Sequence, residues 1–118
     1  MASSVHFSVD RVDQPGGAVL LRLRGDLDVF GAPLLRARIS ELLAERAPLL
    51  VELQAVEFMD SSGLAALLEL RSRARELAWD VRIEGARGRV RELLARTGTL
   101  GLVTAPPETG GVAPDGAY

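Results

Sequence analysis

The first quarter of the chain carries the pattern of a β-hairpin. From residue 5 to residue 12 apolar and polar side chains alternate, which predicts a half-buried strand. The turn-forming residues 13–17 follow, and an apolar stretch from 18 to 23 predicts a second strand. Because the connection is so short, we expect the two strands to pair in an antiparallel hairpin.

After residue 25 the pattern changes to helices that alternate with strands. Apolar residues at helical spacing predict two long amphipathic helices, from about 32 to 47 and from about 62 to 78. Glu69, Arg73 and Glu76 lie on the exposed side of the second helix at spacings that allow ion pairs. The other predicted elements are a strand over 49–53 that continues through 56–59, a strand over 81–83, a helix around 90–97 closed by Gly98, and a short strand over 100–103.

This order of elements predicts an α/β fold. We expect a mixed, mostly parallel sheet of four to five strands, with an N-terminal antiparallel hairpin strand and with helices packed on it. A chain of 118 residues is long enough for one such domain. We assign residues 1–104 to this domain and predict a disordered tail over 105–118, which is rich in Pro, Gly, Thr and Ala.

The composition narrows the possible functions. An apolar content of 47%, a charged content of 25% and a net charge of −2 are typical of a soluble protein, and the charge argues against nucleic-acid binding. The chain has no polybasic run and no lipidation motif, so we expect no membrane association. It has no cysteine, which excludes disulfides and thiolate chemistry. We therefore expect a cytoplasmic protein.

The run Asp60-Ser61-Ser62-Gly63 joins a predicted strand to a predicted helix. Helix N-termini favour negative charge because the peptide dipoles align and several N–H groups lack partners. A phosphate on a serine at this point would be tolerated, so the turn is a candidate covalent switch. The simpler interpretation is that Ser61 caps the helix, which is worth about 1 kcal/mol. Both interpretations remain open at the level of the residues.

A second loop, over residues 25–33, also follows a predicted strand. The carboxyl ends of parallel strands meet at one edge of a sheet, and function gathers there. If the strands that end in these two loops are neighbours, Asp26 or Asp28 approaches Asp60 and Ser61.

The sequence lacks the residues that an enzymatic function at this turn would require. The serine turn is not a Gly-x-Ser-x-Gly elbow, His6 is the only histidine, and there is no lysine to act as a base. Magnesium held by Asp26, Asp28 and Asp60 is chemically conceivable, although aspartates in loops are more often caps and turn residues. A phospho-aspartate receiver would require an acidic pair after the first strand and a lysine, and neither is present. We predict a protein that is not an enzyme and that needs no cofactor or metal.

Three segments of the chain resemble the STAS domains of bacterial anti-sigma factor antagonists, over about residues 5–103. Residues 58–64, Phe-Met-Asp-Ser-Ser-Gly-Leu, look like the phosphoacceptor segment of that family. Residues 24–35 look like its Gly-Glu-Leu-Asp strand end and first helix, and residues 85–98 like its third helix. The chain departs from the family pattern at three positions: Gly31 replaces a usual Thr or Ser, Asp26 a commoner Glu, and Glu52 a commoner Asp.

The resemblance implies a STAS-like fold and the function of an anti-sigma factor antagonist. Such a protein binds a cognate anti-sigma factor, itself a serine kinase of the GHKL type, and thereby frees the sigma factor. Phosphorylation of the serine that matches Ser61 separates the complex, and a PP2C-type phosphatase reverses the modification. The resemblance also implies that a set of neighbours lies near the phosphosite and contacts the partner: Asp28, Asp60, Ser62 and Gly63. The alternative function is a STAS scaffold or adaptor subunit that is never phosphorylated, of the stressosome or lipid-transport accessory type.

Overall fold

The computed structural model describes residues 6–105. They form one four-stranded sheet in the order β1-β2-β3-β4, in which β1 pairs antiparallel with β2 and the other neighbours pair parallel. The strands are β1 (Ser8–Asp13), β2 (Val19–Leu27), β3 (Leu49–Met59) and β4 (Val81–Glu84). The helices are α1 (Gly31–Glu45), α2 (Ser61–Leu77), α3 (Gly88–Arg96) and α4 (Leu100–Val103). The predicted α/β class, mixed sheet and N-terminal hairpin are confirmed.

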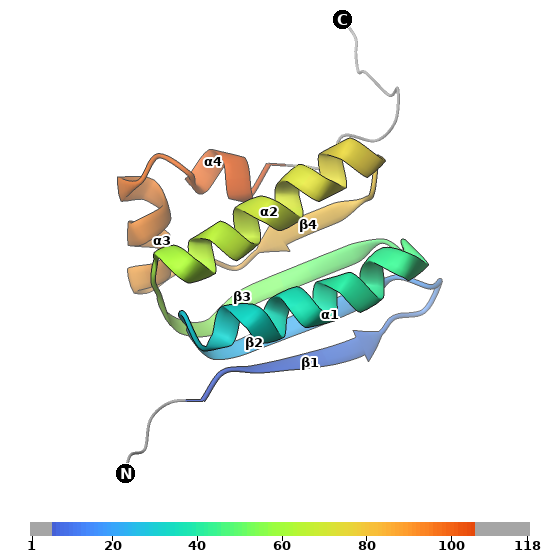
Figure 1. The fold of residues 1–118 in the computed structure, drawn as a ribbon, viewed down its shortest axis with the longest axis horizontal. Coiled ribbons are helices and arrows are strands. Elements are labelled where there is room, and N and C mark those ends of the chain that lie inside the picture. The colour runs from blue at the N-terminus through green and yellow to red at the C-terminus, as the bar shows by residue number, and fades with distance from the viewer. Residues whose placement is uncertain (1–5, 106–118) are drawn as a thin grey trace, which may run out of the picture.

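The helices α1 and α2 lie side by side across one face of the sheet (Figure 1). Side chains of β2 and β3 that point to this face are buried, among them Leu23, Val51 and Leu53. The other face carries polar residues such as Arg22, whose guanidinium forms an ion pair with Glu52 across the parallel ladder at 3.0 Å. This alternation is the period-two pattern that predicted the strands.

The register of β2 and β3 determines where their carboxyl ends lie. β3 carries an extra residue at two places along the ladder, between Glu52 and Ala55 and between Val56 and Phe58. Extra residues of this kind are β-bulges, which bend the strand and re-aim the side chains that follow. Beyond the second bulge, Leu27 pairs with Met59, so β2 and β3 end side by side. The loops that follow both strands therefore meet at one edge of the sheet, which fulfils the condition that the two strands be neighbours.

The run 100–103 is a helix, so the prediction of a last short strand is wrong. A four-residue apolar run does not distinguish a strand from a buried helical turn. In the fold, the backbone N–H of Val103 donates to the carbonyl of Thr99 at 2.9 Å, and Val103 is buried. The buried Arg71 of α2 donates from Nη2 to the carbonyl of Val103 at 3.0 Å and from Nη1 to the carbonyl of Val81 at 2.9 Å. Arg71 thus joins α2 to both α4 and β4.

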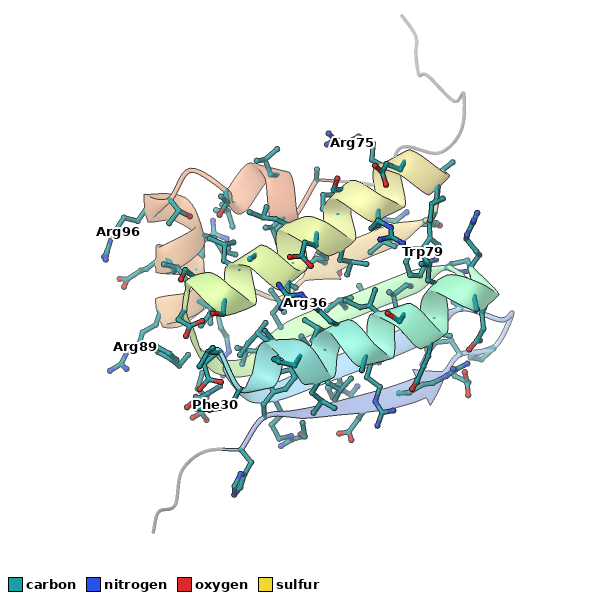
Figure 2. All side chains as sticks on the ribbon, viewed as in Figure 1. Phe30, Arg36, Arg75, Trp79, Arg89 and Arg96 are labelled. Carbon is teal, nitrogen blue, oxygen red and sulfur yellow. The ribbon has the colours of Figure 1, made fainter. Side chains whose placement is uncertain are left out.

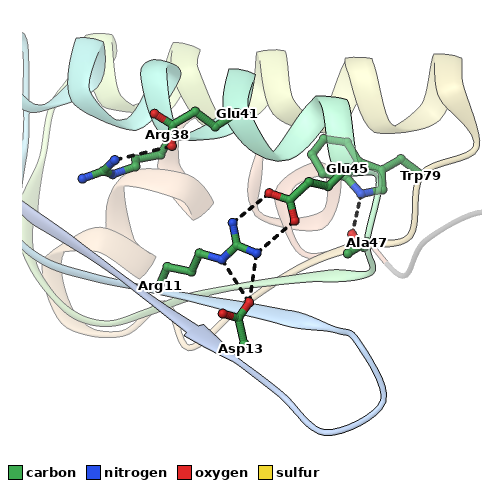
Figure 3. Close-up of polar contacts among 7 residues, drawn as sticks. All are labelled: Arg11, Asp13, Arg38, Glu41, Glu45, Ala47 and Trp79. Carbon is green, nitrogen blue, oxygen red and sulfur yellow. Dashed lines mark hydrogen bonds and ion pairs between the residues drawn. The ribbon is translucent and has the colours of Figure 1, made fainter.

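Ion pairs connect elements that are distant in the sequence. Arg11 of β1 binds Asp13 on its own strand and Glu45 at the end of α1, with an Arg11 Nη1 to Glu45 Oε2 distance of 2.8 Å (Figure 3). Arg36 of α1 binds Glu69 of α2 through two hydrogen bonds of 2.8 Å. Glu69 therefore pairs with the neighbouring helix, although its spacing from Arg73 allowed a pair within α2.

The segment that follows α2 is hydrogen-bonded to the loop before β3. The indole Nε1 of Trp79 donates to the carbonyl of Ala47 at 2.8 Å, and the ring is buried (Figure 3). Gly98 follows Thr97, the C-cap of α3, and has a positive φ of 74°, as predicted for the glycine that closes this helix. None of the helices within residues 6–105 is long and apolar enough to cross a bilayer. Most of the predicted tail, residues 106–118, lies outside the described residues.

Candidate functional site

The serine turn begins α2 at the carboxyl end of β3. Asp60 has an extended backbone, with φ −113° and ψ −171°, and its Oδ1 accepts hydrogen bonds from the backbone N–H groups of Ser62 (2.8 Å) and Gly63 (3.2 Å). Asp60 is therefore the N-cap of the helix, and the interpretation of Ser61 as the cap is wrong. Asp and Ser are comparably good N-caps, so residue type alone did not decide between them.

Ser61 is the first residue of α2, and its side chain is exposed. Within residues 6–105 its hydroxyl makes no hydrogen bond. Ser62 is half-buried. Of the two serine hydroxyls, that of Ser61 is the more accessible to another protein, and its loss would leave the capping hydrogen bonds intact.

Gly63 lets the start of α2 rest directly on the end of β2. A Cβ atom at this position would clash with the carbonyl oxygen of Leu27 and would lie 2.7 Å from Leu27 Cγ. The backbone N–H of Asp60 also donates to the carbonyl of Leu27, at 3.4 Å. Position 63 requires glycine because the helix lies so close to the strand, and not because the backbone has a positive φ.

Asp28 lies two residues before Phe30, the N-cap of α1, and its side chain also accepts hydrogen bonds from backbone N–H groups at a helix start. Its Oδ1 accepts from the backbone N–H groups of Phe30 and Gly31, both at 3.0 Å, and its carbonyl accepts from Ala32 at 2.8 Å. A Cβ on Gly31 would lie 2.8 Å from the carbonyl oxygen of Asp26 and 2.9 Å from Phe7 Cγ. The tight packing explains why this chain has no hydroxyl residue at position 31.

The edge of the sheet between the two capped turns is acidic. The pKa of Asp26 is raised, first because partial burial disfavours the charged carboxylate, and then because Asp28 and Glu57 add negative potential. No group of three or more side chains within residues 6–105 is arranged to hold a metal ion. Two of the three aspartates considered for magnesium, Asp28 and Asp60, instead accept backbone hydrogen bonds.

The structure adds one residue that the sequence did not single out, Phe30, whose side chain is exposed beside the acidic edge. Phe58, which belongs to the predicted phosphoacceptor segment, is also exposed there. An available signal was the position of Phe30 between a strand-ending aspartate and a helix, outside both periodic apolar stripes. His6 is exposed and lies at the same edge, near Asp26, but no nucleophile is paired with it within residues 6–105.

These features define an α/β domain in which an aspartate binds backbone N–H groups at the start of each of two helices, at one edge of a mixed four-stranded sheet. The chain belongs to the STAS domain family, whose model matches residues 11–109. The predicted family resemblance is thereby confirmed.

Individual relatives agree with this assignment. The chain is 26% identical over 99 residues to an anti-sigma-B factor antagonist of Bacillus subtilis (strain 168), covering 84% of this chain and 90% of that protein. The crystal structure of an anti-sigma factor antagonist from Mycobacterium paratuberculosis matches with a TM-score of 0.70 and 26% identity, over 92% of each chain. The unphosphorylated anti-sigma factor antagonist SpoIIAA matches with a TM-score of 0.59 and 24% identity, over 76% of this chain and 82% of that one. These relatives are regulatory proteins by name.

Proposed function

We propose that this protein is an anti-sigma factor antagonist controlled by phosphorylation of Ser61. The unphosphorylated form binds a cognate anti-sigma serine kinase of the GHKL type and so frees the sigma factor. Phosphorylation of Ser61 by that kinase ends the complex, and a PP2C-type phosphatase restores the active form. The observation that carries the proposal is the exposed hydroxyl of Ser61, without a hydrogen-bond partner in the described chain, at the N-terminus of α2.

The local structure around Ser61 can accommodate a phosphate without disturbing the fold of this protein. A phosphoryl group brings about −1.5 to −2 charges at neutral pH. The N-terminus of α2 offsets part of this charge through its dipole, because Ser61 occupies the first helical position. The hydroxyl of Ser61 supports no hydrogen bond that the described fold needs. We therefore expect modification to leave the fold unchanged.

Phosphorylation of Ser61 should mainly lower the affinity for the partner. Asp60 and the acidic residues at the ends of β2 and β3 already make this edge negative, and phosphorylation adds charge to it. A partner surface fitted to a neutral hydroxyl would have to desolvate a bulky dianion without a compensating contact. The complex is destabilised for that reason. We place this exchange of partners in the cytoplasm.

The direct test is phosphorylation of the purified chain by a candidate GHKL kinase with ATP, measured by intact mass. The wild type should gain one phosphoryl group, Ser62→Ala should gain it as well, and Ser61→Ala should gain none. Ser62→Ala is the matched control because it removes the neighbouring hydroxyl from the same turn. Phosphate that remains on Ser61→Ala and disappears from Ser62→Ala would refute the assignment of the acceptor. A complete lack of modification by a kinase that binds the chain would favour the scaffold alternative.

A further inference from the structure

The helices cover only one face of the sheet. Each of them contributes buried side chains to a single core cluster, among them Leu35 of α1, Leu67 of α2, Leu94 of α3 and Val103 of α4. In the view of Figure 1, α1 and α2 lie in front of the sheet. We name the opposite side of the sheet the open face. Because β2, β3 and β4 pair in parallel, and parallel strands are usually covered on both faces, the open face is a candidate interaction surface.

Two rows of side chains cross the open face. The strand pairing places one row over all four strands, and it consists of Val12, Leu20, Leu50 and Arg82. The neighbouring row consists of Asp10, Arg22, Glu52 and Glu84. The first row is mainly apolar: Val12 is 37% exposed, Leu50 is half-buried, and Leu20 is buried although it lies outside the core cluster.

The charges on these rows balance. With Arg24, which follows Arg22 on the same face of β2, the rows carry as many arginines as carboxylates: Arg22, Arg24 and Arg82 against Asp10, Glu52 and Glu84. Within residues 6–105 neither Arg24 nor Glu84 makes a hydrogen bond or an ion pair. Nucleic acid and anionic lipid require an excess of positive charge, which this face does not have. A partner with charges of both signs suits it better.

We propose that the open face binds the open face of a second copy of this chain in a two-fold symmetric dimer. The two-fold axis runs along the strands, between β2 and β3, so it exchanges these two strands. Leu20 then contacts Leu50 of the second copy, and Arg22 contacts Glu52 of the second copy. Each contact occurs twice by symmetry. The register of β2 and β3 thus makes the face complementary to itself in both hydrophobicity and charge.

The dimensions of the sheet allow this arrangement. Sheets that pack face to face lie about 10 Å apart with their strands within about 30° of each other, and an axis along the strands keeps this angle small. Strands of this number and length would bury about 1,000 Å² over both copies, which is at the low end for a specific interface. At the rim, Asp10 faces Glu84 of the second copy, and this repulsion limits the affinity. We therefore expect a weak, reversible dimer.

The dimer leaves the candidate phosphosite accessible. Ser61 begins α2 on the helical side of the sheet, at the carboxyl end of β3, whereas Leu20 and Leu50 lie near the amino ends of their strands. Figure 2 shows Phe30 at the end of the molecule where both α1 and α2 begin, on the side of the sheet that the helices cover. The inference goes beyond the proposed function and does not depend on it. It adds that the active unit presents two copies of Ser61.

The first arm of the test measures the oligomeric state of the purified chain by sedimentation velocity at increasing concentration. The wild type should convert from monomer to dimer, because association follows mass action. Leu50→Glu should weaken the dimer at least about tenfold, since it places a carboxylate in the apolar row near the axis. Leu102→Glu is the matched control, because Leu102 is 50% exposed on α4, away from the open face. It should dimerise like the wild type.

The second arm exchanges charges across the axis. Arg22→Glu and Glu52→Arg each place like charges opposite one another in a homodimer, so each variant alone should be monomeric. An equimolar mixture of the two should form heterodimers, because one chain then presents two carboxylates to the two guanidinium groups of the other. A merely structural role of the Arg22–Glu52 ion pair would not restore association in the mixture. Circular dichroism of each variant verifies that the fold is retained.

A third variant should strengthen the dimer. Glu84→Arg replaces the repulsion with Asp10 of the second copy by an attraction, and Glu84 is an exposed residue without a hydrogen bond in the described chain. The dissociation constant should fall several-fold, and an unchanged or weaker dimer would contradict the orientation of the axis. This variant keeps the proposal testable even if a substitution in the two rows prevents folding.

No measurement here needs a kinase, so these outcomes are independent of the proposed function. A wild type that stays monomeric at every concentration overturns the dimer. A wild-type dimer that persists in Leu50→Glu and in both single charge variants also overturns it, because the copies would then associate through another surface. Loss of association in these variants together with its recovery in the mixture supports the open face as the interface.

Discussion

Gly63 of α2 lies so close to Leu27 of β2 that no side chain fits between them. This contact places the first turn of α2, and with it Ser61, over the end of the neighbouring strand. The hydrogen bond from Asp60 N–H to the same Leu27 carbonyl fixes the turn from the other side. The position of the candidate phosphosite is thus set by two backbone contacts with β2, and neither involves Ser61 itself.

Replacement of Gly63 by alanine should destabilise the fold. The added methyl group overlaps the Leu27 carbonyl, which is backbone and cannot move aside without shifting β2. We expect a loss of about 1–3 kcal/mol in the free energy of unfolding, measured by urea denaturation, as for other overpacked sites. Gly101→Ala is the control, because nothing lies within 4 Å of a Cβ there and α4 gains a better helix former. Equal stability of the two variants would show that the close contact is not important.

The two residues at the start of α2 should respond differently to alanine. Asp60→Ala removes the acceptor for two backbone N–H groups and should cost about 0.5–2 kcal/mol. Ser61→Ala removes only an exposed hydroxyl and should change stability by less than about 0.5 kcal/mol. Thermal unfolding of both variants measures the difference. A larger loss for Ser61→Ala than for Asp60→Ala would contradict the assignment of the cap.

Asp26→Asn should raise stability at neutral pH. Because the folded-state pKa of Asp26 is raised above its ordinary value of 3.8, ionisation of this group opposes folding. Its unfavourable contribution is absent below the unfolded-state pKa and develops as the pH rises through the raised folded-state pKa. The gain of the variant over the wild type should therefore be present at pH 7 and vanish at about pH 3. Urea unfolding at both values tests this, and a gain that is larger in acid would show that the charged carboxylate is not what opposes folding.

Ser61→Asp should fold normally and bind the kinase poorly. One added carboxylate reproduces part of the charge of a phosphate, and the helix N-terminus tolerates it. Competition with the wild type for the kinase measures the effect, while the melting temperature of the variant should stay within a few degrees of the wild type. Ser72→Asp adds the same charge at an exposed position of α2 outside this turn and should retain binding. Tight binding by Ser61→Asp would refute control by charge.

The local pattern of the chain was enough to predict most of its elements. The alternation in the first strands, the helical spacing of leucines and the turn residues between them depend on near neighbours in sequence, so they are visible without coordinates. The strand-to-helix turn at Asp60 and Ser61 is visible in the same way. The adjacency of the two loops was a hypothesis that required their strands to be neighbours, and the pairing of Leu27 with Met59 confirms it.

Other features depend on contacts between distant segments, and no local pattern contains them. Residues 100–103 form a helix because Arg71 and the buried Val103 hold them against α2, far away in the sequence. Asp60, rather than Ser61, became the cap through the backbone path out of β3. The exposure of Phe30 was not predicted, although its position outside both apolar stripes was a signal for it, and only the structure shows the residue to be 86% exposed. The spacing of apolar and turn-forming residues along the chain determined its helices and strands, because these depend on near neighbours in sequence. Tertiary packing decided which polar and aromatic side chains remain exposed, because that depends on contacts between distant segments.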